Sequence, residues 1–435
     1  MQKPTVAILT LGCKVNQYES EAIAERFTAD GFLVLDAQEH CDIYVINTCT
    51  VTAEADRKAG QLVRRVHKQN PDAYILLTGC FSQSQPARAA AIEGVDDICG
   101  NTDKLSVVRA ARALLENGRK STPSVRVSDI MAADFEPMCI TRFDRTRAYV
   151  KIGDGCENRC TYCAIPAARG RVRSKPLADV LAEVQGLVAG GCREVVLTGI
   201  ETASWGRDLE GVGLADLLEA VDAIEGIGRV RLGSLDPSLF TERFVTRIKS
   251  LRSLAPHFHL SMQSGSSRVL ALMKRKYNAE QAKRAVALLR EHIPGVELTT
   301  DFIVGFPGET EADFADTMAL AEYAEFLSMH VFAYSRREGT PAAALPDQIP
   351  GTVKKARSAA LSALGATLTE RRLAKALATP VREVLFETYE NGLAIGHTAD
   401  FLEVAVPSPH PLRSEFHTVT LHKAENGRLL AELKQ

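Results

Sequence analysis

The stretch Gly153-Asp154-Gly155-Cys156-Glu157-Asn158-Arg159-Cys160-Thr161-Tyr162-Cys163 places three cysteines at the spacing C-x3-C-x2-C. Thiolates this close together on one loop can surround a single iron–sulfur cluster. A four-iron cluster with three cysteine ligands keeps one iron without a protein ligand, and that open iron can bind a small molecule. A zinc site usually combines two C-x2-C or Cys/His pairs, whereas this loop has one such pair and no histidine nearby. The spacing therefore favours an iron–sulfur cluster over zinc.

The bulk composition indicates a soluble protein of more than one domain. A chain of 435 residues exceeds one ordinary core, so we expect two or three domains. No apolar run reaches the length of a membrane span, and the short stretch before Val6 lacks the apolar region of a signal peptide. We therefore expect a cytoplasmic protein without membrane contact. The ten cysteines then indicate reduced thiols and metal ligation, and the net charge of −2 limits any nucleic-acid footprint to a local patch.

The N-terminal third contains three short, β-branched, apolar runs that predict strands buried on both faces. Each run ends directly before a cysteine: Val6–Gly12 before Cys13, Ile43–Thr48 before Cys49, and Ala73–Gly79 before Cys80. Helical patterns at 17–30 and 53–69 alternate with them, which indicates an open parallel α/β sheet. Because the carboxyl ends of parallel strands share one edge, the sheet would bring the three cysteines together as a second three-cysteine site.

The other interpretation of these cysteines is simple burial, since cysteine is among the most buried residue types. We apply it to Cys41 and Cys99, which do not end such a strand. Cys139 lies in a polar segment between about residues 117 and 145 that resembles a linker, and we expect no functional role for it.

From Ala148 to Tyr334 a strand–helix rhythm repeats six times. The expected strands are Ala148–Ile152, Glu194–Leu197, Arg229–Leu232, His257–Met262, Leu298–Val304 and Ser328–Tyr334. Six units suit a partial (β/α)6 barrel, in which chemistry lies at the carboxyl ends of the strands. Polar residues and glycines gather there and would suit a ligand with amino-acid, ribose and adenine parts: Thr198, Gly199, Glu201, Ser234, Gln263 and Gly305. For His257 and His259 we expect packing roles.

Local charge points to one possible nucleic-acid surface. Basic residues far outnumber acidic ones between residues 142 and 175, and we expect Arg169, Arg171 and Arg173 to contact RNA phosphates. The run Lys274-Arg275-Lys276 is a second basic patch. The competing interpretation is a solvated surface that binds nothing.

The C-terminal part predicts a long helix and then a small β-barrel. Residues 354–377 are rich in Ala, Leu and Arg, and five short alternating runs follow Pro380. Five strands of this length suggest a barrel of OB-fold size, a type that often binds RNA. Residues 382–435 hold five basic and eight acidic residues, so such binding would rely on shape and aromatic contacts, or the barrel is a packing module.

The motif C-x3-C-x-aromatic-C, with Tyr162 as the aromatic residue, resembles the signature of radical S-adenosylmethionine (SAM) enzymes. The whole chain is similar to the methylthiotransferase family within that superfamily. The similarity includes Leu11–Ser20, Asn47–Thr52, Thr78–Cys80, Arg169–Ser174 and Ser335–Ala342. It implies an N-terminal domain at 1–117, a linker at 118–141, a radical SAM barrel with its closing helix at 142–376 and a TRAM-like β-barrel at 377–435. One departure is Gly233, where we expect serine.

The resemblance also implies cofactors, substrate and partners. Cys156, Cys160 and Cys163 would hold the [4Fe-4S] cluster that binds SAM, and Cys13, Cys49 and Cys80 an auxiliary [4Fe-4S] cluster that carries sulfur. The run Gly12–Glu19 is most similar to the branch that modifies N6-threonylcarbamoyladenosine in tRNA. The implied reaction is radical transfer of a methylthio group to carbon 2 of that nucleoside at position 37 of the anticodon stem-loop. A low-potential flavodoxin or ferredoxin would supply electrons.

Three alternatives remain open. The same chemistry could act on isopentenyladenosine in tRNA or on an aspartate of a ribosomal protein. The third alternative is a non-enzymatic iron–sulfur sensor that binds RNA. A sensor would need no barrel with polar strand ends and would not cleave SAM when reduced.

Overall fold

A parallel sheet of six strands occupies the N-terminal third of the computed structural model, which describes residues 3–143 and 145–434. Its order is β2-β1-β3-β4-β5-β6. The strands are Thr5–Thr10 (β1), Leu33–Leu35 (β2), Ile43–Thr48 (β3), Tyr74–Gly79 (β4), Asp97–Cys99 (β5) and Ser124–Arg126 (β6). The three expected strands are β1, β3 and β4, which lie side by side. The strands that the sequence did not reveal have three residues each, too few for a periodic pattern.

Helices connect these strands and cover both faces of the sheet. They are Lys14–Ala29 (α1), Ala53–Gln69 (α2), Cys80–Ser84 (α3), Pro86–Ala90 (α4) and Ser106–Asn117 (α5). Helix α2 begins where predicted because the Thr52 side chain caps it, accepting a hydrogen bond from the backbone N–H of Ala55. Strand β6 pairs with β5 although it lies in the segment expected to be a linker, so that segment is partly ordered by the sheet.

Six parallel strands form the open barrel of the middle part, as the sequence predicted. They are Arg147–Asp154 (β7), Glu194–Gly199 (β9), Arg229–Leu232 (β10), His257–Gln263 (β11), Glu297–Val304 (β12) and Ser328–Ala333 (β13). Ladders join β7-β9-β10 and β11-β12-β13, and the isolated pairs Val230–Leu254 and Leu235–Leu260 connect the two halves. The two-residue strand Arg173–Ser174 (β8) runs antiparallel to β7.

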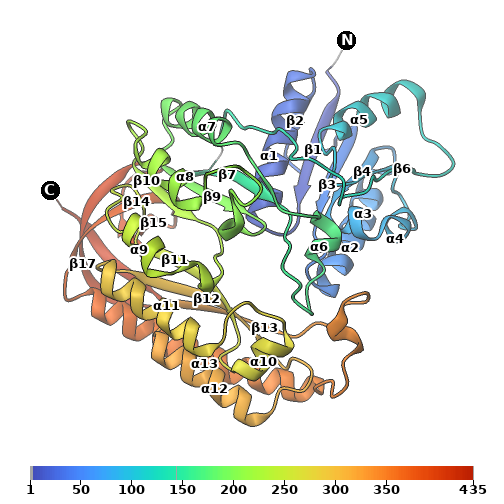
Figure 1. Cartoon of the computed structure of the whole chain (residues 1–435). Coiled ribbons are helices and arrows are strands. Elements are labelled where there is room, and N and C mark those ends of the chain that lie inside the picture. The colour runs from blue at the N-terminus through green and yellow to red at the C-terminus, as the bar shows by residue number, and fades with distance from the viewer. Residues whose placement is uncertain (1–2, 144, 435) are drawn as a thin grey trace.

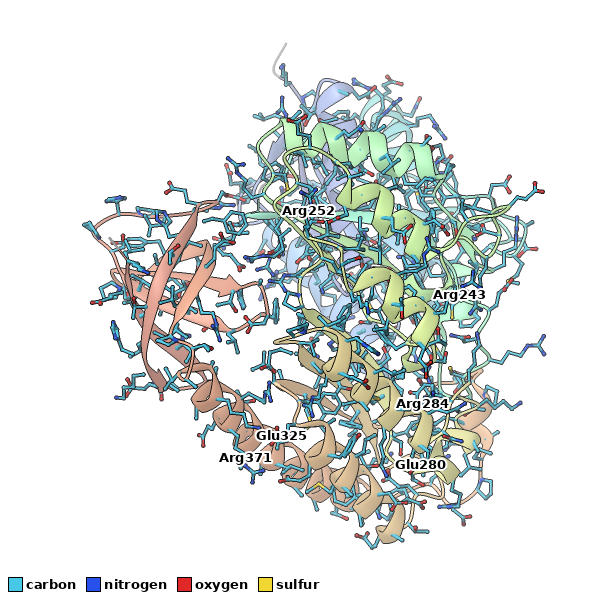
Figure 2. The ribbon with its side chains drawn as sticks, turned by 60° about the vertical axis from the view of Figure 1, so that its left-hand side comes forward. Arg243, Arg252, Glu280, Arg284, Glu325 and Arg371 are labelled. Carbon is cyan, nitrogen blue, oxygen red and sulfur yellow. The ribbon has the colours of Figure 1, made fainter. Side chains whose placement is uncertain are left out.

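Helices cover the outside of the barrel. They are Leu177–Ala189 (α7), Leu214–Asp222 (α8), Glu242–Ile248 (α9), Ser267–Leu272 (α10), Ala279–His292 (α11) and Glu311–Ala324 (α12), and Ile165–Arg169 (α6) lies in the cysteine loop region. Short 3-10 helices occupy Thr202–Ser204, Pro237–Leu239 and Pro341–Ala344. Figure 2 shows charged side chains of both signs on this outer surface, among them Arg243, Arg284 and Glu280. Such mixed charge fits a solvated surface better than an RNA-binding track.

The C-terminal part is a long helix followed by a closed β-barrel. Helix α13, Gly351–Ala376, packs along β13. The barrel has the strand order β14-β15-β16-β18-β17. Its strands are Val381–Glu390 (β14), Leu393–Thr398 (β15), Glu403–Pro407 (β16), Phe416–Glu425 (β17) and Arg428–Leu433 (β18). Figure 1 shows this barrel in red and the N-terminal sheet in blue, on different sides of the central green and yellow strands.

Within residues 3–143 and 145–434, no helix is both long enough and apolar enough to cross a membrane.

Candidate functional site

The cysteine loop of the barrel follows β7 and is held in a fixed fold. The backbone N–H of Cys156 donates to the carbonyl of Gly170 at 3.0 Å, and that of Cys163 to the carbonyl of Cys160 at 3.1 Å. Gly155 has a φ of +73°, and a Cβ there would overlap the backbone that follows α6. The three thiols are electrostatic neighbours of one another. The structure thus brings together the three cysteines predicted from the C-x3-C-x2-C spacing.

Arg275 contacts one of these cysteines. One of its terminal nitrogens lies 3.3 Å from Sγ of Cys160, and the other donates to Oδ2 of Asp236 at 2.8 Å. The Arg275 side chain is only 7% exposed. The sequence placed Arg275 in a basic surface run, and this interpretation is wrong, because the guanidinium is turned inward to Cys160 and Asp236.

The six residues expected at the strand ends all lie at the same edge of the barrel as the cysteine loop. Thr198 and Gly199 end β9, and Glu201 follows them and accepts a 2.7 Å hydrogen bond from Nδ2 of Asn158. Burial and the charge of Asp236 raise the pKa of Glu201. Their contacts with SAM stay a prediction.

The remaining strand-end residues, Gln263, Ser234 and Gly305, differ from one another in backbone conformation and in exposure. Gln263 ends β11 with a φ of 61°, an uncommon value for a residue with a side chain and one that often marks functional sites. Ser234 is exposed. Gly305 has a φ of +71°, and a Cβ there would overlap the side chain of Lys354. The packing of Lys354 therefore already explains why residue 305 is glycine.

Gly233, where the family resemblance led us to expect serine, lies in a crowded polar corner. A Cβ at this position would lie 3.0 Å from Oγ1 of Thr198 and 3.1 Å from Oγ1 of Thr202. The Thr202 hydroxyl is buried and has no hydrogen-bond partner within the described part of the chain. Sequence reasoning missed Thr202, and only the fold brings it beside Thr198.

The second cysteine triad lies at the carboxyl edge of the N-terminal sheet. Cys13 precedes α1, Cys49 follows β3, and Cys80 begins α3. A Cβ at Gly12 would lie 2.8 Å from Cβ and 3.0 Å from Sγ of Cys49, so the two loops touch. Cys80 is an electrostatic neighbour of both other thiols. The topology therefore assembles these three cysteines, which are distant in sequence, as the strand-end pattern predicted.

Arg169 connects this triad to the barrel. Its Nε lies 3.1 Å from Sγ of Cys80, and its terminal nitrogens donate to Oε1 of Glu19 and Oδ1 of Asn16, each at 2.6 Å. The guanidinium also lies 3.1 Å from Oδ2 of Asp154 at the end of β7. The Arg169 side chain has no exposed surface.

The burial of these arginines corrects the expected RNA surface. Arg169 contacts a cysteine and carboxylates instead of solvent. Arg173 is 3% exposed and donates to the carbonyl of Ile130 at 3.2 Å. Neither side chain can form an exposed phosphate contact. Only Arg171 is exposed, and it lies 3.3 Å from Asp134.

Glu19 is the buried anion at the centre of the same network. Its carboxylate contacts Lys104, Lys151 and Arg169. Burial by itself would raise the pKa of Glu19, but the three cations hold that pKa well below its usual range. Because α1 carries Glu19 while β7 and α6 carry Lys151 and Arg169, this ion network fixes the N-terminal sheet against the barrel.

The free thiols suit metal ligation better than nucleophilic catalysis. Burial raises the pKa of Cys49 and of Cys156 to about 12, and that of Cys163 to about 11. Thiols of this kind stay protonated at neutral pH, whereas a bound metal displaces the proton. Both triads therefore have the donor chemistry that an iron–sulfur cluster requires.

One cavity of about 240 Å³ lies between the two triads. Cys163 and Gln263 line it from the barrel, and Val51 and Thr52, which closely follow Cys49, line it from the N-terminal sheet. A substrate in this cavity would touch both cysteine-bearing parts of the molecule.

A group of possible metal ligands outside the cysteines is His259, Asp301 and His330, whose ligand atoms lie within 4.8 Å of one another. His257, the other histidine noted in the sequence, is buried and stacks on Phe401 at 4.4 Å between ring centroids. His257 thus has the packing role expected for it.

Comparison with known proteins agrees with the geometry. Residues 150–321 match the Radical SAM superfamily, and residues 5–100 match the Uncharacterized protein family UPF0004. The radical SAM methyltransferase TsrM from Kitasatospora setae, with cobalamin and a [4Fe-4S] cluster bound, has a similar fold. Its TM-score is 0.56 at 18% identity, covering 78% of this chain and 77% of TsrM.

Curated relatives are similar over nearly the whole chain. The threonylcarbamoyladenosine tRNA methylthiotransferase MtaB of Bacillus subtilis (strain 168) is 39% identical over 97% of this chain and 94% of its own length. MtaB of Thermotoga maritima is 42% identical over 81% of this chain and 80% of its own. A tRNA-2-methylthio-N(6)-dimethylallyladenosine synthase of Moorella thermoacetica is 37% identical over 99% and 98%. With two cysteine triads in matching domains, the chain belongs to the radical SAM methylthiotransferase family of enzymes.

Proposed function

We propose that this protein transfers a methylthio group to carbon 2 of N6-threonylcarbamoyladenosine at position 37 of tRNA. The observation that carries the proposal is a cavity between the two triads, lined by Cys163 on one side and by Val51 and Thr52 on the other. Relatives named threonylcarbamoyladenosine tRNA methylthiotransferase, at 35% to 42% identity, support the choice of nucleoside.

In this proposal each triad holds one [4Fe-4S] cluster. Cys156, Cys160 and Cys163 would bind the cluster at the barrel, which with SAM supplies radical chemistry when both are bound. Cys13, Cys49 and Cys80 would bind the auxiliary cluster, which carries the sulfur. Burial raises the pKa of Cys49 in one triad and of Cys156 in the other, which disfavours nucleophilic attack by these thiols.

The surrounding residues position these ligands and the nucleoside. Arg275 fixes the orientation of Cys160, and Arg169 fixes that of Cys80. A charge-assisted contact to a cysteine sulfur stabilises a thiolate ligand. Thr198, Gly199, Glu201, Ser234, Gln263 and Gly305 are proposed to contact SAM.

The proposed partners are the tRNA anticodon stem-loop and a low-potential electron donor of the flavodoxin or ferredoxin type. Arg171 is the proposed phosphate contact that remains exposed. A cytoplasmic location, where such donors and tRNA occur together, belongs to the same proposal.

Two cysteine variants test whether the two triads have separate roles in SAM cleavage and methylthio transfer. We expect Cys80→Ala to abolish methylthio transfer while SAM cleavage continues, because the barrel triad is intact. We expect Cys160→Ala to abolish both activities. Mass spectrometry of the nucleoside and of 5′-deoxyadenosine gives the two readouts, and Cys139→Ala, an exposed cysteine outside both triads, is the control. Methylthio transfer by Cys80→Ala at the wild-type rate would refute the proposal.

Dimethylallyladenosine in tRNA is the second candidate substrate. The observation that favours it is the Moorella relative, which is 37% identical over 99% of this chain. Incubating the reconstituted enzyme with stem-loops that carry either nucleoside separates the two, because each methylthiolated product has its own mass.

A further inference from the structure

Three polar side chains form a cluster on the inner face of strands β11, β12 and β13. Nε2 of His259 lies 3.2 Å from Oδ2 of Asp301, and Nδ1 of His330 lies 3.0 Å from Oδ1 of the same carboxylate. Asp301 and His330 are directly paired residues of β12 and β13. Nδ1 of His259 also lies 2.9 Å from Oγ1 of Thr299. The strand register therefore fixes the cluster before any ligand arrives.

This cluster reaches the cavity between the two cysteine triads. Asp301 lines the cavity together with Cys163, and Phe332 of β13 lines it two residues beyond His330. Phe332 is 48% exposed, and its ring centroid lies 6.4 Å from that of His330. An exposed aromatic ring beside a polar cluster is suited to stacking on a nucleobase while the polar groups bind its substituents.

Lys14, on the N-terminal sheet domain, is an electrostatic neighbour of Asp301 and His330 in this cluster. It is the first residue of α1, next to Cys13, and within the described residues it has no hydrogen bond or ion pair. Water reaches its side chain, and its electrostatic neighbours include Asp301, Glu194, Arg147 and Arg231. All three donors of this ammonium are available to a ligand.

The charges around Asp301 complete a site for an anion that also carries a hydroxyl. The Asp301 carboxylate raises the pKa of His330 through their hydrogen bond. Because His259 and His330 already contact the Asp301 carboxylate, the Lys14 ammonium is the charge beside this cluster that is left without a hydrogen-bonded partner among the described residues. A carboxylate would satisfy Lys14, and a hydroxyl could bond to the His330–Asp301 pair.

We propose that Lys14 and the His259–Asp301–His330 cluster bind the threonyl carboxylate and hydroxyl on N6 of the adenosine, with Phe332 stacked on the base. This inference rests on the proposed function and names the groups that select its nucleoside. A dimethylallyl group offers the Lys14 ammonium no partner and would leave that charge desolvated and unpaired. Sites built for polar groups reject apolar analogues strongly for this reason.

Binding to two anticodon stem-loops that differ only in the N6 group of the adenosine, threonylcarbamoyl or dimethylallyl, tests the inference. The anaerobically reconstituted enzyme is titrated with each fluorescent stem-loop. We expect Lys14→Gln to weaken binding of the threonylcarbamoyl stem-loop about 10- to 100-fold, the range of a lost charge-assisted hydrogen bond, and to leave the dimethylallyl stem-loop unaffected. Lys58→Gln removes an exposed charge elsewhere and controls for general attraction to phosphates.

His330→Gln is the second variant, because Lys14 is adjacent to Cys13 and its replacement could reduce iron content. We expect this variant to retain iron. It should weaken binding of the threonylcarbamoyl stem-loop and leave binding of the dimethylallyl stem-loop unaffected. Equal weakening of both stem-loops by Lys14→Gln and His330→Gln would overturn the inference, as would equal binding of both stem-loops by the wild-type enzyme. A stoichiometric divalent metal that His330→Gln loses would also overturn it, since the cluster would then be a metal site.

Turnover separates this inference from the proposed function. If the wild-type enzyme methylthiolates the threonylcarbamoyl stem-loop but the variants bind both stem-loops as the wild type does, only the assignment of the cluster fails. If it methylthiolates neither stem-loop, the proposed function fails.

Discussion

At the scale of single residues, we expect the replacement of Arg169 to have a large effect on stability. Its guanidinium joins Cys80, Asn16, Glu19 and Asp154 without any exposed surface. Arg169→Gln would keep part of the volume and remove the charge that two buried carboxylates share. We expect a loss of about 3–5 kcal/mol in the free energy of unfolding, as for other broken buried ion pairs.

Urea unfolding of the apoprotein measures this loss, with Arg171→Gln as the matched control two residues away. Arg171 is exposed, so its replacement should change stability by less than about 0.5 kcal/mol. Equal midpoints for the two variants would show that Arg169 does not stabilise the contact between the sheet and the barrel.

The roles of Arg169 and Arg275 could not be predicted from sequence. Both lie in runs of basic residues, and a charge pattern does not reveal whether a side chain meets water or a buried sulfur. Their partners, Cys80 and Asp236, are distant in sequence and become neighbours only through the fold. The cysteines themselves were predictable, because their spacing and their places after apolar strands are local features.

At the scale of elements, the turn from β4 into α3 depends on Gly79. This residue has a φ of +97°, and a Cβ there would lie 2.5 Å from the backbone nitrogen of Thr48 and 2.6 Å from Oδ1 of Asn47. Gly79→Ala therefore combines backbone strain with a collision against β3. We expect it to destabilise the protein by about 2–4 kcal/mol and to lower iron occupancy of the adjacent Cys80 site.

Gly118→Ala is the control for that element. Gly118 has a φ of +76°, but a Cβ there would meet no atom within 4 Å. Its replacement should cost only the backbone strain, about 1–2 kcal/mol. Thermal unfolding compares the two variants, and equal losses would rule out the collision as the reason for glycine at 79.

Predictability of elements followed their length. The helix α2 and the strands β3 and β10 have the bounds that the sequence predicted, because each contains a full amphipathic or apolar period. The strands β2, β5 and β6 have three residues each and are formed by pairing with longer neighbours. Whether such short strands form depends on pairing with strands that are distant in sequence, and a local sequence pattern does not contain this information.

At the scale of the whole molecule, Glu194 links the central barrel to the C-terminal one. Its buried carboxylate contacts Arg147, Arg229 and Arg231. Arg231 also donates to the carbonyls of Thr398 and Ala399 in the C-terminal barrel. Burial alone would raise the pKa of Glu194, but the three arginines hold that pKa below its ordinary value of 4.5.

This linkage makes the contact between the two barrels sensitive to acid. A carboxyl whose pKa is lower in the folded state contributes stability that is present above its ordinary value and is lost as the pH falls through the folded value. We expect Glu194→Gln to lower the unfolding temperature at pH 7, and the difference from wild type to shrink below about pH 4.5. Glu322→Gln, which breaks an exposed pair with Arg371, is the control. A difference independent of pH would refute this account.

The central claim is that the two triads act on one nucleoside in the cavity between them, and nucleoside mass spectrometry tests it most directly. The anaerobically reconstituted enzyme, with SAM and a reductant, is incubated with a stem-loop that carries N6-threonylcarbamoyladenosine. The account predicts that 2-methylthio-N6-threonylcarbamoyladenosine appears with wild-type enzyme and is absent with Cys80→Ala. An unmodified nucleoside, from wild-type enzyme that still produces 5′-deoxyadenosine, would contradict it.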